Sequence, residues 1–347
     1  MVTPLPDFRL GDYEPLPVGL KRLTLGEMEN AASGFFDGEE AFGLAVHEAR
    51  RSSKRIRAVL RLIRYELGDQ IFKFEDRWMR DTAKLVSPVR DAAALVESVD
   101  VLDRIYGHLL VDGALAGTRQ RLDVRRGRLE MRVMEDPAIV VTVVEKLEKA
   151  HGRYANWPVD PSAKHIYGVG IRDSFEAIGP GLTHTYRRGR REMVSAYTET
   201  LDASKFHEWR KSVKYLRHQM ELLTPIWPEV VVGMAVTLER IGELLGQDHD
   251  LAMLLQKLDA DAALGFADSS SRSGSSCLRR GAGLTHRSLR RLLGVARSGQ
   301  HRSSRGRRGL NRRTTGGQRV TGTRHSGNPE CSHRVGDRKQ SHTDGFQ

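Results

Sequence analysis

Cysteine is almost absent from this sequence, which argues against the disulfide framework of a small secreted protein. The two cysteines among its 347 residues, Cys277 and Cys331, lie far apart. We therefore expect no disulfides and a reducing compartment. The sequence also lacks a long apolar run, and its N-terminus has no basic segment followed by an apolar one. We accordingly expect no membrane partner and a cytoplasmic location.

Signatures of catalysis are missing as well. The sequence contains no P-loop, no HExxH, no GxSxG and no CxxC pair, and no nucleophile stands beside a base. We therefore expect a protein that is not an enzyme and uses no cofactor. Aromatic residues make up 6% of the chain, and the tryptophans fall in helical or linker contexts typical of a core. A stacking platform for single-stranded nucleic acid is thus unsupported.

Strand-like alternation between hairpin turns is also absent, and its absence predicts an all-α protein. Apolar residues make up 39% of the chain and recur mainly at helical spacing, so the length suffices for two domains with cores. The predicted helices cover residues 16–36, 39–67, 70–86, 87–110, 114–153 with a kink or break at Pro137, 205–224, 229–245 and 248–264.

One basic stretch, VHEARRSSKRIRAVLRLIR at 46–64, is written twice, and its second copy is FHEWRKSVKYLRHQMELL at 206–223. A solvated helix face usually mixes both signs of charge and has no reason to be repeated, so we interpret the two stripes as a polyanion-binding surface. The second copy is less purely basic, since Glu221 takes the place of Arg61. In the first copy, one helical stripe beside an apolar arc contains His47, Arg50, Lys54, Arg57, Arg61 and Arg64.

Other motifs repeat at nearly the same offset. Pro180-Gly181-Leu182 corresponds to Val18-Gly19-Leu20, and Asp91 corresponds to Asp250. A repeat of this length indicates a duplicated domain. We therefore predict a first helical bundle at 1–155, a second at 156–268 and a separate tail at 269–347. A pseudo-twofold axis between the bundles would bring the paired basic helices together around a basic central pore.

The tail carries the excess of positive charge. Residues 269–347 hold 17 Arg and one Lys against three acidic residues, a net charge of +15, whereas the whole chain is +12 and residues 1–268 are therefore −3. The tail is rich in Arg, Ser and Gly, and we expect it to be disordered. Because it offers no counterpart of residues 114–153, we favour a frameshift near residue 268 over a native basic tail.

Three further groups of residues could carry chemistry. YRRGRR at 186–191 concentrates arginine, which binds phosphate oxygens bidentately. His47 and His207 begin the two basic stripes among cations that disfavour their charged forms, and they could donate to phosphate or respond to pH. For QDHD at 247–250, the preferred interpretation is that it caps a helix N-terminus. The second interpretation is that these residues orient basic side chains together with Asp91, and the third is a metal site. A metal site at the histidines themselves is less convincing, because the adjacent glutamates point off the stripe.

The duplicated HxxRxxxKxxR pattern, TYRRGRREM at 185–193, FHEWRKSVKYLRHQMELLTPIWP at 206–228 and LLGQDHDLAMLLQKL at 244–258 strongly resemble the CHAD family, the conserved histidine α-helical domain. The resemblance covers about residues 15–265. It implies two four-helix bundles around a basic pore, non-catalytic binding of inorganic polyphosphate and residence on polyphosphate granules. By position, it implies that the polyphosphate-binding residues are His47, Arg50, Arg51, Lys54, Arg57, Arg61, Arg187, Arg188, Arg190, Arg191, His207, Arg210, Lys211, Lys214 and Arg217.

The sequence departs from the family in two respects. Members are often fused to a triphosphate-tunnel domain with an ExExK strand motif. This motif is missing here, so we do not expect the enzymatic activity of that domain. The family's last helices in the second half are missing or altered, and their loss would lower the stability of the second bundle. We predict a polyphosphate-binding protein. The alternatives are a nucleic-acid-binding protein that uses the same stripes or the tail, and a metal-dependent polyphosphate or nucleotide phosphohydrolase with Asp91, Asp248 or Asp250 at its metal.

Overall fold

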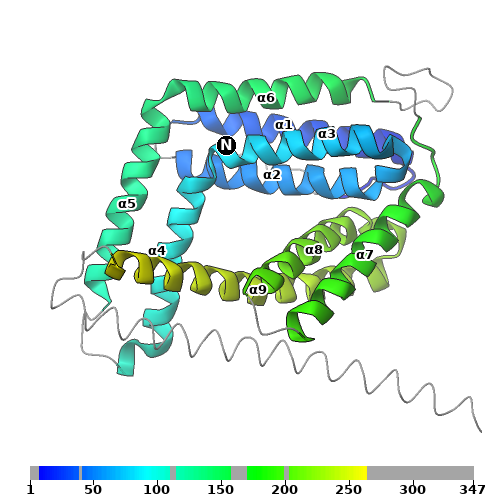
Figure 1. Ribbon diagram of the computed structural model, residues 1–347. Helices are drawn as coiled ribbons and strands as arrows, with labels where there is room; N and C mark the ends of the chain where they lie inside the picture. Colours follow the sequence, from blue (N-terminus) through cyan, green and yellow to red (C-terminus); the bar gives the residue numbers. More distant parts are fainter. Residues whose placement is uncertain (1–7, 39–40, 110–114, 158–169, 199–202, 264–347) are drawn as a thin grey trace, which may run out of the picture. The chain divides into compact units, whose positions relative to one another are not determined.

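The computed structural model describes residues 8–38, 41–109, 115–157, 170–198 and 203–263, and all regular secondary structure in these ranges is helical (Figure 1). The all-α prediction is therefore confirmed for the described part of the chain. The predicted tail at 269–347 lies outside these ranges, as do residues 158–169 and 264–268 of the predicted second bundle. The α-helices are α1 (Leu16–Ser33), α2 (Phe42–Leu62), α3 (Arg64–Leu85), α4 (Ser87–Tyr106), α5 (Ala116–Glu135), α6 (Pro137–Ala155), α7 (Phe175–Thr198), α8 (Ala203–Leu222) and α9 (Pro228–Ala263).

Local chemistry sets the helix boundaries near the first basic stretch. α2 ends with Ile63 as its C-cap, and α3 begins at the next residue. Gly68 interrupts α3 with a φ of 75°, which glycine adopts without steric penalty. The predicted helix through residues 114–153 is broken at Pro137, whose ring cannot continue a helix. Asp136 caps α6 by accepting a hydrogen bond of 3.1 Å from the backbone amide of Ala138.

α9 corrects one local prediction. The sequence indicated two helices, but α9 runs without a break from 228 to 263. Asp248 and Asp250 therefore lie inside a helix, and the interpretation that they cap a helix N-terminus is wrong. A helical glycine costs only about 1 kcal/mol relative to alanine, and Gly246 is accommodated here. A Cβ at Gly246 would lie 3.5 Å from Nη2 of Arg210, so this glycine lines the space that the arginine occupies.

The largest apolar core lies between α1, α2, α3 and α6 and includes one side of α8 (Figure 1). Full burial of one large apolar side chain contributes about 1.5–3 kcal/mol. The apolar side chains that α8 buries in this core therefore hold it firmly against α2. No helix within the described ranges is both long and apolar enough to cross a membrane. Residues of this core that are almost inaccessible to solvent include Leu20, Ile56, Leu60, Met79, Tyr154 and Leu222.

α2, α7 and α8 meet at a close junction. A Cβ at Gly181 of α7 would overlap the carbonyl oxygen of Leu62 at the end of α2, so only glycine permits this approach. Gln219 of α8 donates from Nε2 to the carbonyl oxygen of Ala58 at 3.1 Å and to Oγ1 of Thr185 at 3.3 Å. The junction thereby fixes how far the basic stretches on α2 and α8 can slide along each other.

Candidate functional site

The two copies of the repeated basic stretch lie on α2 and α8, which contact each other (Figure 1). Ile56 and Leu216, which are aligned in the repeat, are both buried, as their place on the apolar arc predicts. Since each helix turns its apolar arc into the core, the cationic stripe beside that arc emerges next to the other helix. The beginnings of the two stripes therefore come together.

Four basic side chains form the centre of this site, and we call them the inner cluster: Arg50 and Lys54 of α2 with Arg210 and Lys214 of α8. Lys54 lies within electrostatic reach of Arg50 and Arg210, and Lys214 lies within reach of Arg210 and Lys54. Burial, followed by these like charges, lowers the pKa of Lys54 to about 8 and the pKa of Lys214 to about 6. The inner cluster thus concentrates positive charge where water shields it poorly.

Two aspartates face the inner cluster, Asp91 from α4 and Asp250 from α9. Oδ1 of Asp91 lies 3.2 Å from Nη2 of Arg50. Asp250 is in the corresponding position beside Arg210, and burial raises its pKa even though Arg210 and Lys214 oppose that shift. The pair fits the second interpretation of these residues, in which acidic groups on neighbouring helices orient the basic side chains.

Three nitrogen atoms at this site are buried without a hydrogen-bond partner among the residues that the structure describes. They are Nη1 of Arg50, Nε of Arg210 and Nδ1 of His207. A buried polar group left without a partner costs about 1–3 kcal/mol. Two of the three are guanidinium nitrogens, which can only donate. The chain therefore holds donors in place at some cost to its stability, and an anion would satisfy them.

Two histidine rings lie close together, tilted against each other, beside the inner cluster. The ring centroids of His207 and His249 lie 4.4 Å apart, with 38° between the ring planes. Burial and then the neighbouring cations lower the pKa of both, and the pKa of His249 falls to about 4. His47 is more exposed, and its pKa is lowered by burial and then by Arg90. All three imidazoles are accordingly neutral at pH 7 and can each donate one N–H.

Arg90 and His249 were not among the predicted ligands. Arg90, on α4, acts electrostatically on Lys54 and Arg210 and pairs with Glu97, with 3.1 Å between Nη2 and Oε2. A single basic residue outside a repeated stripe gives little sequence signal. The usable signal was the alignment of the aspartates, because Arg90 directly precedes Asp91 and His249 directly precedes Asp250.

Arg57 and Arg61 lie on the same stripe but away from the inner cluster. Both pair with Asp76 of α3, with 2.9 Å between Nε of Arg57 and Oδ1 of Asp76. The guanidinium carbon of Arg61 also stands 3.8 Å from the ring centroid of Tyr215, a favourable cation–π contact. These two arginines thus hold α2 against α3 and α8, and their charge is partly neutralised.

The remaining predicted ligands lie outside the inner cluster. Arg187, Arg190 and Arg191 are exposed on α7. Four others have acidic partners, which reduces the charge that they can offer a ligand. These pairs are Arg51 with Glu48 at 3.2 Å, Lys211 with Glu208, Arg188 with Glu192 at 2.7 Å and Arg217 with Glu239 at 2.9 Å.

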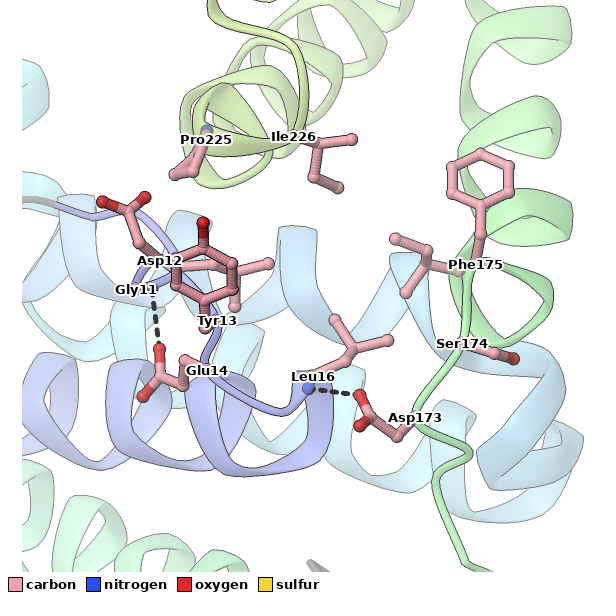
Figure 2. A pocket seen from close by; sticks show the side chains of 12 residues that line it. Gly11, Asp12, Tyr13, Glu14, Leu16, Asp173, Ser174, Phe175, Pro225 and Ile226 are labelled. Carbon is pink, nitrogen blue, oxygen red and sulfur yellow. Dashed lines mark hydrogen bonds between the residues drawn. The ribbon is translucent and has the colours of Figure 1, made fainter.

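A cavity of about 570 Å³ lies between the segment before α1, the start of α7 and the segment before α9, and no residue of the inner cluster lines it (Figure 2). Two of its carboxylates accept hydrogen bonds from backbone amides. Glu14 accepts a hydrogen bond of 2.8 Å from the amide of Gly11, and Asp173 accepts one of 2.7 Å from the amide of Leu16. Within the described ranges, no three His, Cys, Asp or Glu side chains are grouped in a way that could hold a metal ion.

Comparison with known proteins agrees with the resemblance found in the sequence. No curated protein matches the chain. Among protein families, the CHAD domain matches residues 24–259, which span α2 to α8 whole and most of α1 and α9. The match covers more than half of the chain and contains every residue of the inner cluster. The chain belongs to the CHAD-domain family.

Proposed function

We propose that this protein binds inorganic polyphosphate at the inner cluster and catalyses no reaction on it. The observation that carries the proposal is the set of half-buried basic side chains, two from each basic helix, with donor atoms that have no hydrogen-bond partner in the described part of the chain. Family membership supports the same ligand class. Polyphosphate matches these features because every phosphate along its chain carries charge and acceptor oxygens, so one ligand can meet both helices.

We further propose that the two halves are duplicated bundles and that the inner cluster lies in a basic pore between them. The corresponding placements of Asp91 beside Arg50 and of Asp250 beside Arg210 support this symmetry. In this arrangement each half contributes one wall, and a flexible chain of phosphates threads between the walls. Residence on polyphosphate granules would follow from binding and needs no separate targeting element.

Binding would be electrostatic and multivalent. Charge-assisted hydrogen bonds from the guanidinium groups and lysines meet successive phosphates, and the neutral histidines add further donors. Each contact releases counterions, so the affinity falls as salt rises, with a slope of about −0.7 per contact if single-stranded nucleic acid is a fair guide. An affinity that does not depend on salt would contradict this mechanism.

The decisive experiment removes one wall at a time. In the full chain, one double variant carries Arg50→Ala with Lys54→Ala, and another carries Arg210→Ala with Lys214→Ala. Each removes two charge-assisted contacts, each worth about 1.5–3 kcal/mol, so each should lower the affinity for labelled polyphosphate at least about a hundredfold. The loss of either wall also forfeits the effective concentration that it gave the other. Fluorescence anisotropy measures the affinity, and circular dichroism checks folding.

A matched control separates this site from general electrostatics. Lys73→Ala with Lys149→Ala removes the same number of basic side chains at exposed positions on α3 and α6. We expect the control to bind within a few-fold of wild type, because exposed charges are screened by salt. If the control loses as much affinity as the inner variants, attraction is spread over the surface and the proposed site is wrong.

Two competing functions are tested with the same protein. If the chain is a nucleic-acid-binding protein, DNA or RNA should displace polyphosphate more readily than polyphosphate displaces them. If it is a metal-dependent phosphohydrolase, phosphate should be released when Mg²⁺ or Mn²⁺ is added. We expect neither result, and either one would replace the proposed function.

A further inference from the structure

Lys54 and Lys214 face each other across α2 and α8 in the middle of the inner cluster. Among the described residues, no carboxylate oxygen lies within ion-pair distance of either lysine. The fixed charges around the two lysines are mostly positive. Those facing Lys214 are Arg210 and Arg217 of α8, Lys54 of α2 and Asp250 of α9. Those facing Lys54 are Arg50 of α2, Arg210 and Lys214 of α8, and Arg90 and Asp91 of α4. The imidazoles of His207 and His249 also face Lys214, and that of His47 faces Lys54.

Only some of these groups can relieve the repulsion between them. An arginine in a protein keeps its proton at any physiological pH, whereas a lysine can give its proton up. The charge of the free cluster is therefore adjusted at its lysines. Burial followed by Arg210 and Lys54 lowers the pKa of Lys214 to about 6, so at pH 7 this side chain is mostly a neutral amine. Lys54, with a pKa of about 8, stays mostly charged.

A bound polyanion changes this balance. Its oxygens bring negative charge to within contact of the cluster and favour the ammonium form of each lysine. We propose that polyphosphate binding is coupled to the uptake of a proton by Lys214, so that the ligand itself completes the charge of its site. This inference rests on the proposed function and adds its regulation by pH. The step adds one proton from the solvent to the free amine and makes or breaks no other bond.

The direction of the pH dependence follows from linkage. Below about pH 6 Lys214 already carries its proton in the free protein, so binding takes up none at this residue and Lys214 adds no pH dependence to the affinity there. Above that pH the complex holds a proton that the free protein lacks, and the affinity falls by up to about tenfold per pH unit. Above about pH 8, Lys54 adds a second proton in the same way.

Titration calorimetry measures this coupling directly. The full chain is titrated with long-chain polyphosphate at pH 7 in two buffers that differ in their enthalpy of ionisation. Long chains are used because their internal phosphates do not titrate near neutral pH. With a free-protein pKa of about 6 for Lys214, the dependence of the observed enthalpy on the buffer should correspond to about one proton taken up per cluster.

Substitutions assign the proton to its residue. Lys214→Arg keeps a permanent charge and cannot titrate, so proton uptake at pH 7 should disappear while binding persists. Lys149→Arg on α6, far from the cluster in the fold, should take up the same number of protons as wild type. If Lys214→Arg does not fold, Lys214→Met serves instead: it also lacks a titrating group, so its uptake should disappear while its affinity falls.

Each possible outcome is informative. Binding with no dependence on the buffer would overturn the inference and leave the proposed function intact. Uptake that survives in the Lys214 variants would assign the proton to His207, His249 or the ligand, and would overturn it as well. Absence of binding by the folded wild-type chain in every buffer would instead remove the proposed function on which the inference rests.

Discussion

Two polar clusters lie along the same pair of helices, α2 and α8, and they are built in opposite ways. In the first, which we call the Arg55 cluster, Arg55 donates to Glu27 at 2.7 Å and pairs with Glu221 of α8. His218 contacts Glu221 at 3.1 Å, and Ser52 donates to Glu27 at 2.6 Å. In the inner cluster, by contrast, four basic side chains meet only two peripheral aspartates. Unpartnered buried donors occur in both clusters within the described ranges: Nε of Arg55 in the first, and Nη1 of Arg50 and Nε of Arg210 in the second.

The difference indicates which cluster serves folding. A buried charge is tolerated when the opposite charge and its hydrogen bonds are close, as they are around Arg55. In the inner cluster, burial and then the neighbouring like charges lower the pKa of both lysines, and this arrangement destabilises the free fold. Nothing in packing alone requires such an arrangement, and the proposed function accounts for it through a ligand that brings the missing negative charge.

The largest expected effect comes from breaking the balanced cluster. Arg55→Met leaves the carboxylate of Glu27 buried beside an apolar side chain, and Glu27 is only 7% exposed. Removing one partner of a buried pair costs about 3–5 kcal/mol, so the free energy of unfolding should fall by about that amount in urea titrations. The comparison variant is Arg80→Met, which breaks an exposed pair with Asp81 and should cost about 0–1 kcal/mol.

This prediction also tests the contrast itself. If Arg55→Met and Arg80→Met have equal stability, the Arg55 cluster contributes no more than a surface pair. The two clusters on α2 and α8 would then not differ in their structural role, and burial would be the wrong criterion for telling them apart.

A smaller effect, of opposite sign, is expected in the inner cluster. Lys214→Met removes an amine that lies among cations and replaces it with an apolar chain of similar length. Replacing a residue held for function commonly stabilises a protein by about 0.5–2 kcal/mol, and we expect the free energy of unfolding at pH 7 to rise by that amount. Lys149→Met, at an exposed position on α6, should stay within about 0.5 kcal/mol of wild type.

Bound polyphosphate should stabilise wild type more than Lys214→Met. Binding stabilises the folded state in proportion to affinity and concentration, so saturating ligand should raise the melting temperature of wild type more than that of Lys214→Met. A Lys214→Met protein that is less stable than wild type without ligand would show that the lysine contributes to folding. The contrast between the two clusters would then fail at this residue.

Much of this arrangement could be predicted from the sequence. The repeated stretch gave the two helices, their apolar faces and the residues that meet at the inner cluster. The alignment of Asp91 with Asp250 indicated that acidic groups face the basic stripes, although the helix-cap interpretation ranked first. That ranking was wrong because it assumed a helix start at residue 248, whereas α9 is continuous there and Gly246, without a side chain, leaves room for Arg210.

Spacing alone could not predict which arginines of the α2 stripe pair with a carboxylate of a neighbouring helix and which belong to the inner cluster. Helical periodicity places Arg50 and Arg57 on the same face but does not say which neighbouring helix brings a carboxylate to each. Asp76 reaches Arg57 only because α3 folds back along α2. Glu221 likewise looked like an impurity in the second basic stripe, yet it is the partner of Arg55 across the helix pair.

The smallest expected effect separates these two kinds of arginine on one helix. Arg57→Gln leaves Asp76 paired with Arg61, so the change exposes no unpaired buried charge, and it touches none of the unpartnered donors. We expect polyphosphate affinity to fall by less than about threefold, which corresponds to under 1 kcal/mol. Arg50→Gln removes a donor of the inner cluster and should lower affinity more than about tenfold. Anisotropy titrations at one salt concentration compare the two variants, which carry the same change in net charge. Equal losses would mean that the ligand contacts the whole stripe of α2, and that the pairing of Arg57 with Asp76 opens when polyphosphate binds.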